Sequence, residues 1–231
     1  MCNVLIPEMQ PEHSYVSLQD DGQYHSATRT IQIVIALAQV HLILMALSIP
    51  GMICFPSGCI SDDGYIRTVS DGLKDNSVLA TTLWGSGMTW ITATRYLGVV
   101  GTSTVFAWVA HIMIIVATYA SFLTIRYDMF EVHHVSSAVV WIVSSFLFHF
   151  ATTIHSEANR SHVASYILLV GIILGIVFVT LFTLVELEVI SMDSDASIHL
   201  LSTISLIEVA TVLSIMVLDF VQSRHVLVCL E

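Results

Sequence analysis

Four ionisable side chains lie well inside long apolar stretches of the sequence, away from their ends, where charge is costly. Glu208 lies about midway along the last stretch and His41 in the middle of the first. His111 and His149 lie in the third and fourth. A charged residue at a membrane-helix centre costs about 2.5–3.5 kcal/mol on insertion scales, so its presence needs a reason. If these faces meet, the carboxylate and imidazoles would form a structural hydrogen-bonded cluster, a lipid-headgroup or proton site, or a metal site.

The sequence itself indicates no catalytic, metal or cofactor motif. Ser145 and His149 share a helix face at i,i+4 spacing, but no oxyanion donor or strained turn accompanies them. No Gly-rich phosphate loop and no Cys/His metal motif stands in the sequence. We therefore expect a protein that is not an enzyme and holds no cofactor, with a lipid-modifying activity as the open alternative.

The elements that must position these residues are six apolar stretches, each about long enough to cross a ~30 Å hydrocarbon core. Of 231 residues, 55% are hydrophobic and only 11% are charged, and the mean hydropathy is +0.83. Backbone exposed to lipid must satisfy its own hydrogen bonds, so we expect an all-α bundle of six transmembrane helices. The expected spans are residues 31–54, 78–100, 102–125, 135–154, 163–187 and 198–221.

Outside the spans, the sequence predicts a disordered, acidic cytoplasmic leader (residues 1–30) and a short cytoplasmic tail (223–231), flanking a membrane domain (31–222). Within the leader, Tyr15-Val16-Ser17-Leu18 has the form of a tyrosine-based sorting signal. The expected partners are therefore the lipid bilayer, sorting adaptors and other membrane proteins. The net charge of −11 excludes nucleic acid, whose phosphates would be repelled.

Loop charges favour a cytoplasmic N-terminus, with Arg29, Arg95, Arg160 and Arg224 on that side. Cys54 and Cys59 then fall on the oxidising side, where a disulfide and two free thiols are both compatible with the sequence. Asn159 begins a glycosylation sequon on the cytoplasmic side, where it would not be modified.

Small residues, proline and charges suggest how the spans end and pack. Pro50-Gly51 is expected to stop or kink the first span. Gly171 and Gly175 have the small-xxx-small spacing of a close helix crossing, within the chain or in a homodimer. Asp219 and Arg224 are expected to anchor the last span at the membrane surface.

Several short motifs, in order, give the chain a family resemblance. The first loop has Ile60-Ser61-Asp62-Asp63-Gly64, and the second span ends in Thr94-Arg95-Tyr96. The fourth opens with His134-Val135-Ser136-Ser137-Ala138-Val139, and the last carries Glu208 and Asp219-Phe220 with Gln222. In this order the chain resembles the damage-regulated autophagy modulator (DRAM) family. That family belongs to a wider six-span group with plasma-membrane relatives and GPI-lipid-remodelling factors.

The chain also departs from the family pattern. Tyr65-Ile66-Arg67 replace the usual prolines after the first-loop motif, and Val209 replaces the Trp expected after Glu208. The resemblance implies a non-enzymatic protein that modulates autophagy and lysosomal function. The alternatives are a plasma-membrane scaffold that regulates phosphoinositide-kinase recruitment and a GPI-anchor lipid-remodelling factor. For the location of the protein, the resemblance favours the lysosomal or endosomal membrane, with the plasma membrane second and the Golgi or ER third.

Overall fold

The structure is a computed structural model that describes residues 18–54, 57–99, 104–126, 133–155, 162–186 and 195–228. These residues are mostly helical, with one isolated β-bridge between Ile60 and Ile66. The helices are α1 (Leu18–Cys54), α2 (Val69–Asp75), α3 (Ser77–Leu79), the π-helix η1 (Ala80–Trp84), α4 (Gly85–Leu97), α5 (Val105–Ile125), α7 (His134–His155), α8 (His162–Glu186) and α9 (Asp195–Val228).

Five of the helices described are long and apolar enough to cross a membrane. They lie within α1, α5, α7, α8 and α9, which correspond to the first, third, fourth, fifth and sixth expected spans. The second expected span, 78–100, is built differently, as a run of α3, η1 and α4 that ends at Leu97. The structure therefore confirms an all-helical chain with five such helices, and not the full set of six.

The first helix is longer than the sequence predicted at its N-terminal end. α1 begins at Leu18 and continues through Pro50 to Cys54, so residues 18–30 are helical and Pro50 does not end the helix. No proline lies between Pro11 and Pro50, so the helix meets no proline along that length. Tyr15 of the expected sorting signal lies outside the described residues, and Leu18 is the first residue of α1.

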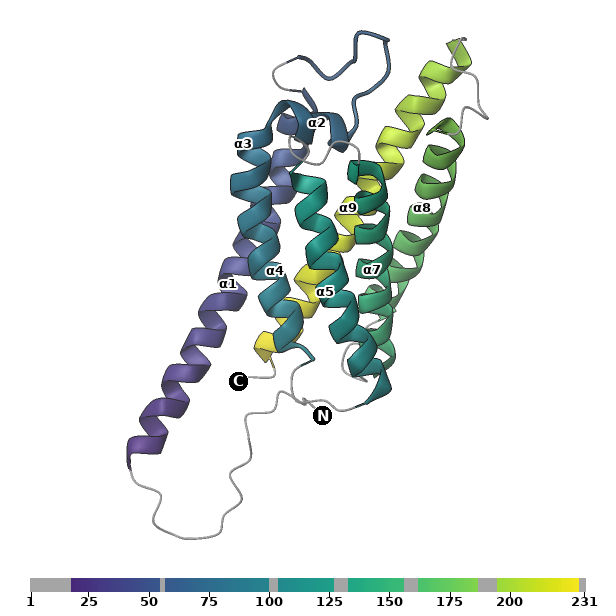
Figure 1. Ribbon diagram of the computed structural model, residues 1–231. Helices are drawn as coiled ribbons and strands as arrows, with labels where there is room; N and C mark the ends of the chain where they lie inside the picture. The colour runs from purple at the N-terminus through teal and green to yellow at the C-terminus, as the bar shows by residue number, and fades with distance from the viewer. Residues whose placement is uncertain are drawn as a thin grey trace.

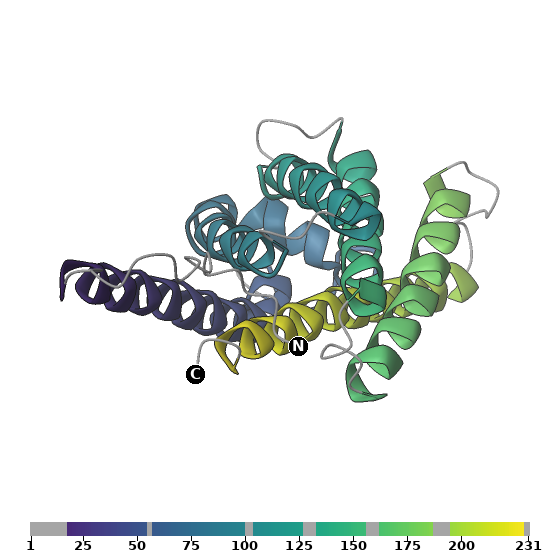
Figure 2. The ribbon, with the colours of Figure 1, turned by 90° about the horizontal axis from the view of Figure 1, so that it is seen from below.

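The long helices run alternately up and down the bundle (Figure 1). α5 lies beside α7 and α8 beside α9, while α1 packs against α4 and α9. Viewed from below, α9 runs obliquely across the bundle (Figure 2). The start of α1 and the end of α9 lie at one end, and α2 lies at the other, between the helix ends (Figure 1).

Gly171 and Gly175 of α8 face the bundle and not a lipid-exposed surface. A Cβ atom at Gly171 would lie 2.7 Å from Phe146 Cε1 on α7 and 3.1 Å from Ser214 Cβ on α9. A Cβ at Gly175 would lie 3.1 Å from Phe146 Cε2. The two glycines therefore let α8 approach Phe146 closely, which is the intramolecular alternative of the sequence analysis.

Candidate functional site

The loop after α1 is held in a defined shape by local contacts. A disulfide joins Cys54 and Cys59, and the Arg67 N–H donates to the Cys59 carbonyl at 3.1 Å. Between them the Ser61 N–H donates to the Tyr65 carbonyl at 2.9 Å, in a turn where Gly64 has φ +89°. That backbone conformation favours glycine. Burial raises the pKa of the Tyr65 phenol, and the carboxylates of Asp71 and Asp63 raise it further.

A capping box starts α2 directly after this loop. The Thr68 hydroxyl accepts a hydrogen bond from the Asp71 N–H at 2.9 Å, and the Asp71 carboxylate accepts one from the Thr68 N–H at 2.9 Å. The neighbouring Arg67 is buried and forms an ion pair with Asp75. These contacts satisfy donors that a helix start leaves open, so this short helix has a fixed beginning.

One face of α9 binds the loop and α2 to the bundle. The Glu208 carboxylate accepts hydrogen bonds from the Val69 N–H and the Ser70 hydroxyl, both at 2.9 Å. Higher on the same helix, the Ser205 hydroxyl donates to the Ile66 carbonyl at 2.6 Å and the Ser202 hydroxyl accepts from the Ile66 N–H at 3.0 Å. Glu208 is therefore a link between the last helix and the first loop.

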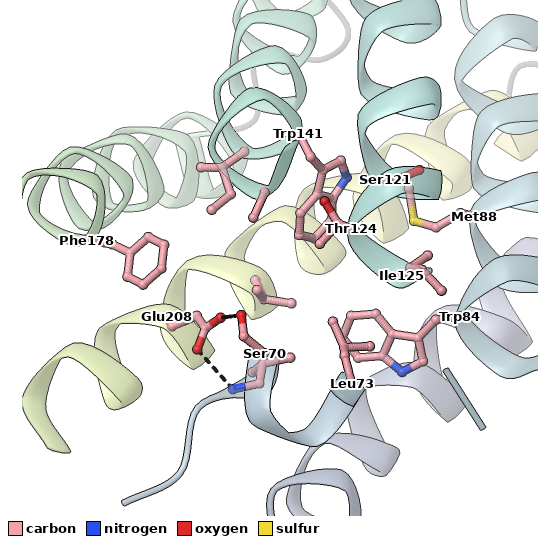
Figure 3. Close-up of a pocket in the computed structure, with 14 residues that line it drawn as sticks. Ser70, Leu73, Trp84, Met88, Ser121, Thr124, Ile125, Trp141, Phe178 and Glu208 are labelled. Atoms are coloured by element: carbon pink, nitrogen blue, oxygen red, sulfur yellow. Dashed lines mark hydrogen bonds between the residues drawn. The ribbon is translucent and has the colours of Figure 1, made fainter. Parts of the chain in front are cut away.

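A cavity of about 30 Å³ lies beside Glu208 (Figure 3). This volume suffices for a water molecule. Its lining is mostly apolar, with Trp84, Trp141 and Phe178 among the walls. The Trp84 indole N–H donates to the Ser48 hydroxyl at 3.0 Å. The indole N–H of Trp141 is buried and has no hydrogen-bond partner.

A second buried cluster joins α4 to α9, toward the opposite end of the bundle. Arg95 and Asp219 form a two-pronged ion pair, with Nε to Oδ1 at 2.7 Å and Nη2 to Oδ2 at 2.8 Å. Both side chains are at most 5% exposed. The expectation that Asp219 anchors α9 at the membrane surface is therefore wrong, because its carboxylate faces Arg95 inside the bundle. Arg224, one turn further on, is exposed.

The helix α7 completes this cluster. The Arg95 Nη atoms donate to the Ser145 hydroxyl at 3.3 Å, and the guanidinium lies 5.1 Å from the Phe148 ring centre. His149 Nε2 lies 3.2 Å from Asp219 Oδ1 but makes no hydrogen bond there. The Ser145 hydroxyl thus accepts hydrogen bonds from the guanidinium that pairs with Asp219, so these contacts join α4, α7 and α9.

The four intramembrane residues of the sequence analysis occupy separate places. Glu208 faces α2, while His149 faces Asp219. His41 Nδ1 lies 2.8 Å from the Leu37 carbonyl of its own helix, and His111 Nδ1 lies 2.7 Å from that of Ala107. The structure therefore does not bring them into one cluster. Among the residues described, no group of three His, Cys, Asp or Glu side chains could hold a metal ion.

The remaining family-motif residues occupy varied positions. Ile60, Asp62 and Gly64 are exposed in the first loop, where Ser61 is half-buried. Tyr96 is exposed and its ring stands edge-on to that of His111. His134 is buried, with Nδ1 3.1 Å from the Thr124 carbonyl. Phe220 is half-buried on α9, and Asn159 lies outside the described residues.

Sequence reasoning missed the partners of Arg95 and Glu208. The signal for the first was the pair of opposite charges near the ends of the second and sixth spans. For α2, the signal was Thr68 three residues before Asp71, which is a capping-box pattern. Nothing in the pattern of the sequence pointed to Glu208 as the residue that meets α2.

The fold and the buried polar contacts define an all-helical integral membrane protein, on the basis of five long apolar helices. Comparison of the chain with family models, with curated proteins and with solved structures found no match.

Proposed function

We propose that this chain is a non-enzymatic multi-pass membrane protein that modulates autophagy and lysosomal function, at the lysosomal or endosomal membrane. One observation carries the proposal. Two of the motif residues that resemble the DRAM family contact each other although they lie far apart in the sequence. Arg95 of the second-span motif forms an ion pair with Asp219 of the last.

The other motif of the last helix supports the same reading. Glu208 accepts hydrogen bonds from Val69 and Ser70, which directly follow the loop that contains Ile60–Gly64. These two contacts bring the motifs of the last helix to the second-span motif and to the segment after the first-loop motif. Their contacts are structural in kind, which agrees with a function carried by surfaces and not by bond-making.

We further propose that the run α3–η1–α4 is a sixth crossing. It follows the first loop and runs back along α1 toward the opposite end of the bundle (Figure 1). Trp84 and Ile91 are buried within it while Leu79 is exposed. Six crossings would place both chain ends on one side of the membrane.

The test combines localisation with autophagic flux in cells that lack the endogenous protein. We expect the wild-type chain to reach endolysosomal membranes and to restore turnover of autophagic cargo. Tyr15→Ala is expected to shift the protein to the cell surface, whereas Tyr24→Ala, the matched control, is not. The proposal would be overturned if no endolysosomal pool were found. It would also be overturned if cargo turnover were the same with and without the protein.

Two further variants, each with its own measurement, test the alternative functions. Deletion of residues 1–17, which stops before α1, would abolish phosphoinositide-kinase recruitment if the protein were a plasma-membrane scaffold. An altered lipid composition of GPI anchors in cells carrying Glu208→Gln would indicate a lipid-remodelling factor. Either result, with cargo turnover unchanged, would replace the autophagy proposal.

A further inference from the structure

An apolar groove of about 440 Å³ lies between α7 and α8. It forms where the helices separate, because α8 packs more extensively on α9 than on α7. Both helices are among those long and apolar enough to cross a membrane. Phe150 of α7 and Ile176 of α8 line the groove and are exposed. In a bilayer the groove therefore opens to the hydrocarbon, and its occupant comes from the membrane.

The length and volume of the groove set the size of its occupant. Its lining runs from Ile142 to Phe150 on α7 and from Ile172 to Thr180 on α8. Each of these stretches covers about 12 Å at the rise of an α-helix. A volume of about 440 Å³ over that length gives a mean cross-section of roughly 40 Å². This is wider than one extended hydrocarbon chain, and it suits a flat body of fused rings.

The walls of the groove are stiff. Five apolar residues of the lining branch at Cβ, namely Ile142, Val143, Ile172, Ile176 and Val179. Such side chains have few χ1 rotamers, so the walls keep their shape. A rigid ligand loses little conformational freedom in a preformed groove, whereas two flexible acyl chains of the same total width would lose much more. The walls therefore favour a rigid ring system over a pair of acyl chains.

A single hydroxyl marks one end of the groove. Among the described residues that line it, Thr180 carries the only polar side chain, it is exposed, and none of these residues is charged. Thr180 lies six residues before Glu186, where α8 ends, at the end of the bundle that also holds α2 (Figure 1). At the other end of the lining, Ile172 lies near the middle of α8. The hydroxyl is therefore at the end nearer to a membrane surface.

From these observations we propose that the groove between α7 and α8 binds one sterol molecule. The sterol hydroxyl forms a hydrogen bond with the Thr180 hydroxyl, and the fused rings lie between the side chains of α7 and α8. The hydrocarbon tail points toward the bilayer centre. This matches the orientation of a sterol in a leaflet, where its hydroxyl faces the headgroups. The inference does not depend on a role in autophagy.

The test is photocrosslinking of a cholesterol analogue, with a diazirine in its ring system, to the full-length protein in phosphatidylcholine nanodiscs. We expect saturable labelling of residues that line the groove, and excess cholesterol should suppress it. Epicholesterol differs only in the configuration of the carbon that carries the hydroxyl. We expect it to compete about fivefold less well, because the hydrogen bond to Thr180 is lost. Labelling that does not saturate, labelling confined to other helices, or equal competition by the two sterols would overturn the proposal.

Two pairs of variants separate the parts of the site. Thr180→Val keeps the shape of the side chain but removes the hydroxyl, and we expect it to weaken sterol binding about fivefold. Thr183→Val, exposed on the same helix but outside the groove lining, is its matched control. Ile176→Trp should fill the groove and remove most of the labelling, whereas Ile173→Trp, exposed on α8 outside the lining, should not.

Folding is checked for each variant by its thermal unfolding and by monodisperse elution. If Ile176→Trp does not fold, the labelled residues of the wild type still test the site. Unchanged labelling of folded Thr180→Val and Ile176→Trp would overturn it. So would a phospholipid that stays bound in the groove when cholesterol is added. A dimer in sterol-free nanodiscs that Ile176→Trp disrupts would overturn it too, because a second copy would then fill the groove.

Discussion

Loss of the ion pair between Arg95 and Asp219 is expected to destabilise the helical bundle. Replacement of Asp219 by Asn leaves the Arg95 guanidinium buried with its charge uncompensated. Breaking a buried pair in this way costs about 3–5 kcal/mol. We therefore expect Asp219→Asn to lower the free energy of unfolding by that order, measured by denaturant or thermal unfolding of the protein in detergent.

A double variant distinguishes the loss of the pair from the loss of packing. Arg95→Met with Asp219→Leu removes both charges, and we expect it to unfold less readily than either single variant. Arg224→Gln is the exposed control on the same helix and should be nearly neutral. If Asp219→Asn and Arg224→Gln unfolded alike, the buried ion pair would have no stabilising role.

The capping box at Thr68 is a second contact whose contribution a single substitution can measure. Thr68→Ala removes the hydroxyl that accepts the Asp71 N–H, and the loss of a cap costs about 1 kcal/mol. We expect faster amide hydrogen exchange over α2, with little change in α5. Thr203→Ala on α9, whose exposed hydroxyl only bonds its own helix, is the control. Unaltered exchange in α2 would show that Glu208 and the disulfide already fix the helix.

Tyr65 provides a pH-dependent test of the first loop. Its phenol has a raised pKa because burial and nearby carboxylates disfavour the phenolate. The neutral form is therefore favoured in the folded state, and this contribution is complete below the unfolded pKa of about 10 and is lost as pH rises through the folded pKa. We expect the Tyr65 absorbance change in a difference titration against Tyr65→Phe to occur above that of a model tyrosine. A titration at or below the ordinary value would contradict the burial of this ring.

The lengths of the apolar stretches predicted the positions of most helices, because each stretch is a local property of the sequence. The five long helices follow from continuous hydrophobic runs, and their bounds differ from the expected ones mainly in α1 and α9, which extend beyond the apolar run. The short helix α2 carried a readable signal, while the π-helix η1, which places Trp84 at the cavity, carried none. The pairing of Arg95 with Asp219 depends on the relative rotation of three helices, which no single segment encodes.

The close approach of α8 to α7 gives a prediction for that element. Gly171→Leu would place its side chain where Phe146 lies, since even a Cβ there would be 2.7 Å from the ring. Overpacking of this kind costs about 1–3 kcal/mol. We expect a lower melting temperature in detergent, with the loss measured by thermal unfolding.

The matched control is Gly51→Ala in α1, where a Cβ atom would meet nothing within 4 Å. In a helix this change is neutral or slightly stabilising. Equal effects of Gly171→Leu and Gly51→Ala would mean that α8 does not pack on Phe146 in the membrane. An increase in dimer content for wild type over Gly171→Leu would instead place these glycines at an interface between two copies.

For the whole molecule, the buried arginines change how loop charges are counted. Arg95 and Arg67 each form an ion pair inside the fold, so neither acts as a free loop charge. Without these two, the loop charges expected from the sequence are Arg29, Arg160 and Arg224 on the side of the chain ends, and Lys74 and Arg126 on the other. The positive-inside rule therefore still favours cytoplasmic ends.

This orientation gives a topology that tags can measure. Epitope tags at both ends are expected to be reached by antibody only after the membrane is permeabilised, if the crossing count is six. A tag inserted after Asp62, in the exposed first loop, is expected to lie on the opposite, non-cytosolic face, where an oxidising compartment would maintain the Cys54–Cys59 disulfide. Five crossings, with α3–η1–α4 failing to span, would place the two end tags on different faces. The end tags therefore decide between the two counts, because a missing crossing changes which face one of them reaches.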